Sequence, residues 1–111
     1  MDAITDRFDA EAEGEDEPRV LDIEIDIEFQ KKRFTTLHLE EPTAKQLERA
    51  ELELNSPQPT AYMMRRYQIA LVSAVAKVPR EVVLELKHSQ LTRAFDFLSG
   101  LLDVSQRDTA T

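Results

Sequence analysis

VLDIEIDIEF, residues 20–29, alternates between apolar and acidic side chains from its second residue onward. One set of alternate positions carries only large apolar residues, namely Leu21, Ile23, Ile25, Ile27 and Phe29. The other set carries only carboxylates, namely Asp22, Glu24, Asp26 and Glu28. Successive side chains of a β-strand point to opposite faces, so this period of two predicts a strand with one buried and one solvated face.

A second strand is predicted at residues 34–39, after a polar turn. The side chains that share its apolar face are Thr35, Leu37 and Leu39. Both apolar faces must meet the same core, so we expect Ile27 to pair with Leu37 and Ile25 to pair with Leu39. This register requires a loop of odd length, about five residues, and the absence of Asn-Gly or Asp-Gly agrees with a longer loop.

Helices are expected to cover the apolar face of this hairpin, because a lone hairpin is only marginally stable in water. They are predicted at about residues 44–54, 61–77 and 79–86 and in a last helix from residue 89 onward. Thr43 and Gln46 have the spacing of a capping box, and Thr60 and Ser89 are expected as the N-caps of later helices. The predicted fold class is α+β, with an N-terminal β-hairpin packed on a small bundle of about four helices.

The chain of 111 residues is short enough for one folded domain. Residues 1–19 hold eight acidic and two basic residues and few large apolar ones, so we expect a disordered acidic tail there. Residues 20–102 are expected to form a single α+β domain, followed by a frayed C-terminal tail at 103–111. Most of the net charge of −8 lies in the acidic tail, and the nearly neutral domain argues against nucleic acid as a partner.

The residue types present do not assemble into a catalytic, cofactor or metal site. There is no cysteine, and the only glycines are Gly14 and Gly100, so thiolate ligands and a glycine-rich phosphate loop are both lacking. His38 and His88 lie in different predicted elements, and the acidic strand lacks the turn and glycine of a calcium loop. We therefore predict a protein that is not an enzyme and needs no cofactor or metal.

Helix 61–77 is the strongest candidate for a partner-binding surface, because apolar residues cover most of its circumference. Methionine suits adaptable binding surfaces. The residues proposed for contact with a partner or a second copy are Met63, Met64, Tyr67 and Leu71, with Leu98, Leu101 and Leu102 of the last helix as alternatives. A plain core helix explains the same pattern, and the sequence leaves both interpretations open.

Three motifs, in a fixed order along the chain, resemble a known family. LHLEEPT at residues 37–43 comes first, and IALVSAVAKVP at residues 69–79 comes second. The third is VVLEL at residues 82–86, which leads into a last helix with Phe95 and Leu98. In this order the motifs resemble the phage tail assembly chaperone family, in particular that of Mu-like phages and prophages. Members often carry Arg where this chain has Glu40, which inverts one charge.

The resemblance implies a function in phage tail morphogenesis. Members of the family bind the tape measure protein, a long helical protein, and keep it soluble until tail tube subunits polymerise around it. The tail tube protein is a second expected partner, and self-association is also expected. The resemblance further implies action in the host cytoplasm and absence from the mature virion. No window approaches the about 18 apolar residues of a membrane span, so no membrane partner is predicted.

Two other functions fit the composition. One is an acidic decoy that mimics nucleic acid and blocks a DNA-binding protein, for which the acidic strand face and the tail would be essential. The other is a small intracellular adaptor with a different partner. Binding by a decoy would weaken steeply with salt, whereas binding through apolar helices would resist salt.

Overall fold

The computed structural model describes the backbone of residues 19–110 and the side chains of residues 19–102. Within this range two strands, β2 (Val20–Phe29) and β3 (Lys32–Glu40), precede four helices. The helices are α2 (Ala44–Glu51), α3 (Ala61–Ala76), α4 (Arg80–Leu84) and α5 (His88–Ala110). The predicted α+β class is confirmed, whereas the predicted acidic tail, up to residue 18, lies outside the described residues.

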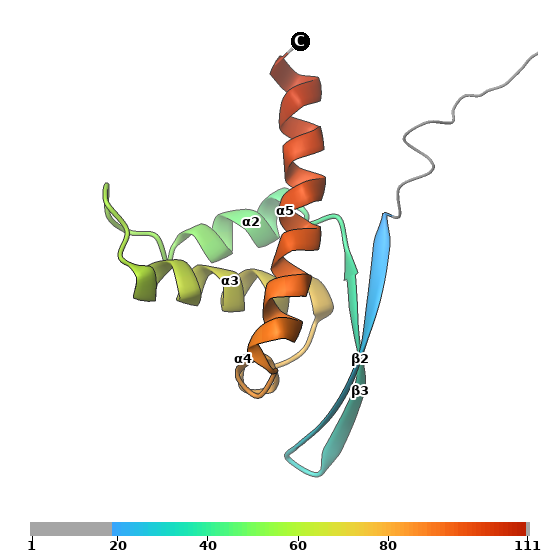
Figure 1. The fold of residues 1–111 in the computed structure, drawn as a ribbon. Coiled ribbons are helices and arrows are strands. Elements are labelled where there is room, and N and C mark those ends of the chain that lie inside the picture. Colours follow the sequence, from blue (N-terminus) through green and yellow to red (C-terminus); the bar gives the residue numbers. More distant parts are fainter. Residues whose placement is uncertain (1–18, 111) are drawn as a thin grey trace, which may run out of the picture.

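α3 is the central element of the fold. It contacts β3 and all three other helices. Figure 1 shows the hairpin on one side of the molecule, with its turn end projecting beyond the helices and α5 crossing close to α3. None of the described helices is long and apolar enough to span a membrane.

The register predicted for the hairpin is wrong. Leu37 pairs with Ile23 rather than with Ile27, and Leu39 pairs with Leu21 rather than with Ile25. The loop is a two-residue turn rather than a loop of about five residues. Its residues, Gln30 and Lys31, have φ of 53° and 65°, the left-handed conformation that a type I′ hairpin turn requires at both central positions.

A β-bulge in β2 reconciles the tight turn with a single apolar face. The regular pairs on either side of it are Glu24 with Thr36 and Ile27 with Phe34, so two residues of β2 lie opposite Thr35 alone. Because β2 has one residue more than β3 at the bulge, the inward and outward positions of β3 exchange between the bulge and the turn. Phe34 therefore takes the inward place near the turn, and Thr35, predicted on the apolar face, is exposed.

The predicted helix starts are confirmed at two caps and corrected at a third. Thr43 and Gln46 form the capping box of α2, and the Thr60 hydroxyl accepts a hydrogen bond from the Met63 N–H at the start of α3. Ser89 is not a cap, because α5 begins one residue before it. The Lys87 N–H at this start donates instead to the Gln90 side-chain oxygen at 2.9 Å.

The helix ends differ from the prediction in both directions. α2 stops at Glu51, three residues short of the predicted end, whereas α5 runs on to Ala110 through the stretch predicted as a frayed tail. α3 ends at Ala76, and its C-cap, Lys77, takes the left-handed conformation with φ of 60°. The Ser73 hydroxyl then donates to the Val78 carbonyl at 2.6 Å and closes the last turn.

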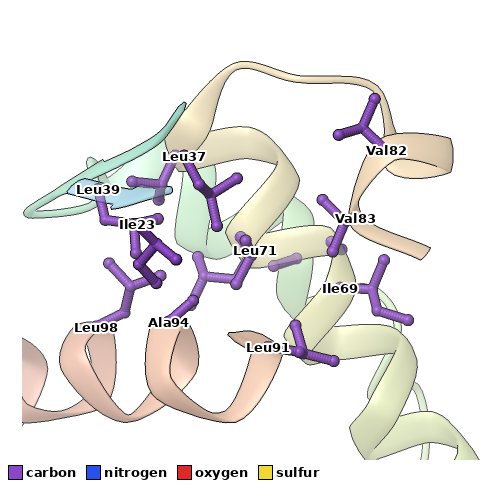
Figure 2. Close-up of a cluster of buried hydrophobic side chains, with 14 of the residues drawn as sticks. Ile23, Leu37, Leu39, Ile69, Leu71, Val82, Val83, Leu91, Ala94 and Leu98 are labelled. Carbon is purple, nitrogen blue, oxygen red and sulfur yellow. The ribbon is translucent and has the colours of Figure 1, made fainter. Parts of the chain in front are cut away.

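The hydrophobic core joins the hairpin to all four described helices. Its most completely buried large side chains are Leu37, Leu39, Leu71, Leu98, Val72, Val82 and Val83. Figure 2 shows Leu71 of α3 between the hairpin residues on one side and Val83 of α4 on the other, with Leu98 of α5 facing the hairpin. Burial of these side chains supplies the main favourable free energy of the fold.

Candidate partner-binding groove

The seven residues predicted for partner contact do not form one surface. Leu71 and Leu98 are completely buried in the core, where a partner cannot reach them in the folded state. The partly buried ones are Met63, Tyr67, Leu101 and Leu102. Met64 is the most exposed of the seven, at 38%.

Tyr67 joins α3 to α5. Its ring meets the edge of Phe95 with the centroids 5.8 Å apart and the planes at 78°, a favourable T-shaped contact. Burial, together with the nearby Glu51 carboxylate, raises the pKa of the Tyr67 hydroxyl above its usual value. Tyr67 therefore contributes to the packing of α3 against α5.

An open groove with a volume of about 360 Å³ lies between the first half of α3, α4 and the start of α5. Its floor is the outer edge of the core, made of Ile69, Val83 and Leu91. Figure 2 shows these three side chains together, away from the hairpin end of the cluster. The walls are Tyr62 and Leu84, which are 70% and 54% exposed. Large apolar side chains thus stand in solvent beside an apolar floor.

The rim of the groove carries two arginines. Arg65, Arg66 and His88 line it, and no lining residue is acidic. No carboxylate among the described side chains forms an ion pair with either arginine. The groove therefore combines an apolar centre with guanidinium groups whose donors remain available to a partner.

The wall at Leu84 exists because α4 is held in one orientation. Pro79 is the N-cap of this five-residue helix, and Arg80 forms an ion pair with Glu53 at 3.0 Å. Val82 and Val83 are buried in the core, which anchors one side of the helix. Each residue of a helix turns by about 100°, so the next residue, Leu84, must point outward.

The family model for phage tail assembly chaperone proteins (E, or 41 or 14) matches residues 20–103, which is most of the chain. The chain belongs to this family. Membership implies a non-enzymatic role in phage tail assembly. No curated protein and no solved structure matched the chain.

The groove of this tail assembly chaperone was missed at the sequence level. The run Val82-Val83-Leu84 held a usable signal, because three consecutive apolar residues cannot all face one side of a helix. Tyr62 and the arginines gave no such signal. They became part of a site only when α4 and α5 were placed beside α3.

Part of the acidic face of the chaperone's hairpin is paired within the hairpin itself. Arg33 pairs with Asp26 and, at 3.5 Å, with Glu28. His38 lies 2.6 Å from Asp22, and hydrogen bonds to Asp22 and Glu40 raise the pKa of His38. Carboxylates that are engaged within the hairpin are less available to mimic nucleic acid, so this pairing does not favour the decoy hypothesis.

Residues 19–102 hold no group of three His, Asp or Glu side chains placed to bind one metal ion. His38 and His88 lie in β3 and at the start of α5, respectively. In the described structure, His88 contacts the Thr92 hydroxyl at 3.5 Å, a local contact within one helix turn.

Proposed function

We propose that this chaperone binds the tape measure protein and keeps it soluble until tail tube subunits assemble around it. Family membership supplies the assembly role. The observation that carries the finer proposal is the exposed apolar groove with Tyr62 and Leu84 on its walls. An apolar surface of this kind on a small domain is typical of an interaction site.

The physical basis of the proposal is the replacement of one apolar contact by another. A long helical client that awaits assembly exposes apolar stripes, and these stripes aggregate with one another in water. A chaperone that lays an apolar groove over part of such a stripe shields it from other client chains. The acidic residues of the chain add net negative charge to the complex, which favours solubility.

The proposal includes no chemical step. The chaperone acts by reversible binding, in the host cytoplasm, and is released before the virion is complete. The tail tube protein, which displaces it from the client, is the second partner. Self-association of the chaperone would multiply the weak contacts of one groove along a long client.

The test is co-expression of the full chain with the tape measure protein encoded beside it, followed by affinity capture and sizing. We expect a client that is insoluble alone to become soluble and to elute with the chaperone. The complex should persist at high salt, because apolar contacts dominate it. A client that is equally soluble without the chaperone, and is not captured by it, would refute the proposal and leave an adaptor with another partner.

A further inference from the structure

The groove between α3, α4 and α5 has a chemistry that restricts its occupant. We propose that it binds an amphipathic client helix whose apolar stripe is bordered by carboxylates. This inference rests on the proposed function, because it specifies which segments of the client are bound and by which surface.

The apolar part of the groove sets the first requirement. Tyr62 of α3 and Leu84 of α4 both line the groove, as do the core residues Ile69, Val83 and Leu91. The volume of about 360 Å³ accepts a few side chains and cannot enclose a helix. A helix laid across such a groove inserts side chains spaced three and four residues apart and leaves its other faces in solvent.

The rim sets the second requirement. Arg65 and Arg66 flank the apolar centre, with His88 on α5. A guanidinium group offers paired N–H donors that match the two oxygens of a carboxylate. Glutamate or aspartate beside the apolar stripe of the client therefore meets the arginines as its leucines enter the groove, whereas lysine at those places is repelled.

A second surface beside α4 is acidic, and it adds to the preference for clients with acidic borders at the first groove. A second groove, of about 440 Å³, runs between α4 and the turn half of β2. Its carboxylates are Asp26, Glu28, Glu81 and Glu85. Arg33 pairs with the first two, whereas Glu81 and Glu85 have no ion-pair partner among the described side chains and supply most of the negative charge. A helix with acidic borders is repelled from this side and attracted to the other, so α4 divides two surfaces that sort clients by charge.

The first experiment uses variants of the full chain. Arg65→Glu/Arg66→Glu reverses the rim, and Leu84→Asp disrupts one wall. Their matched controls are Lys45→Glu/Arg49→Glu, which makes the same charge change on exposed positions of α2, and Leu52→Asp, at a 72% exposed leucine outside the groove. We expect the groove variants to lose capture of the tape measure protein and the controls to retain it, with all four proteins folded by circular dichroism.

The second experiment uses two synthetic helical peptides. Both carry leucines at i, i+3, i+4 and i+7, with glutamate on both borders in one peptide and lysine in the other. We expect the wild-type chain to bind the glutamate peptide about tenfold more tightly, and Arg65→Glu/Arg66→Glu to reverse the preference. Binding is measured by fluorescence anisotropy at about 0.15 M salt, where the screening length of about 8 Å limits the influence of distant charges.

The outcomes separate this inference from the proposed function. Capture of the client by the wild type and equally by both groove variants would overturn the groove assignment alone. A wild type that captures no client would overturn the proposed function. Equal affinity for the two peptides, or a preference for lysine, would overturn the charge selection.

Discussion

The two halves of α3 differ in composition and in their surroundings, because residues 61–68 include Arg65, Arg66 and Gln68, whereas residues 69–76 are apolar except for Ser73. In the second half, Ile69, Leu71 and Val72 are all buried, whereas in the first half Tyr62 and Met64 are exposed. Figure 1 shows the start of α3 on the side of the molecule away from the hairpin. The composition of each half therefore agrees with its burial. The neighbouring elements decide which apolar residues of the first half, such as Tyr62 and Met64, stay exposed.

This contrast explains why one helix can serve two purposes. The second half of α3 carries the fold, because all the buried residues of this helix lie there. The first half is free to expose Tyr62 beside Arg65 and Arg66, since the buried half already anchors the helix. Substitutions in the two halves should therefore separate stability from binding.

Leu71→Ala should have the largest effect on stability. The side chain is completely buried, so its truncation leaves a cavity, and we expect the free energy of unfolding to fall by about 3–5 kcal/mol. Urea denaturation followed by circular dichroism measures this. A loss below about 1 kcal/mol would mean that the second half of α3 is not the packed centre of the fold.

Thr60→Ala should have an intermediate effect, at the start of the exposed half. The Thr60 hydroxyl accepts a hydrogen bond from the Met63 N–H at 3.1 Å, and loss of such a cap costs about 1 kcal/mol. Thr60→Ser keeps the hydroxyl and is the matched control. If the serine variant were as unstable as the alanine variant, the cap would not be the cause.

Tyr62→Ser should change stability by less than about 0.5 kcal/mol, because the side chain is 70% exposed. It should nevertheless weaken capture of the tape measure protein, since it removes one wall of the groove. Leu52→Ser, at an equally exposed site outside the groove, should leave capture unchanged. Loss of capture in both variants would show that general surface hydrophobicity, and not the groove, binds the client.

The smallest effect on stability is expected for His38, which lies on the hairpin and not in α3. Hydrogen bonds to Asp22 and Glu40 raise the folded-state pKa of His38. The stabilising contribution is therefore fully present below the unfolded pKa of about 6.5 and is lost as pH rises through the higher folded pKa. His38→Gln should flatten this slope in urea midpoints measured across that window, without changing client capture. An unchanged slope would mean that the pairing with Asp22 adds nothing to stability.

Much of the fold could be predicted from local patterns. Alternation in residues 20–29 predicted β2, and the Thr43 and Gln46 spacing predicted the cap of α2, because both depend on chemistry within a few residues. The register could not be predicted, because the bulge in β2 brings the turn and the core into agreement, and no local residue marks it.

The candidate site could be predicted far less well. Met63, Met64, Tyr67 and Leu71 were chosen because helix 61–77 is apolar nearly all round. Periodicity cannot tell which part of such a circumference its neighbours cover. The structure buries Leu71 and assembles the groove from Tyr62 and Leu84, which come from different helices.

What the sequence determined by itself is the set of elements, their order and the family to which the chain belongs, since these depend on local pattern and on residue identity. The tertiary structure alone decided the hairpin register, which apolar residues of α3 stay exposed, and the meeting of an apolar groove with two arginines. These features depend on contacts between residues far apart in the chain, and such contacts form only when the elements pack.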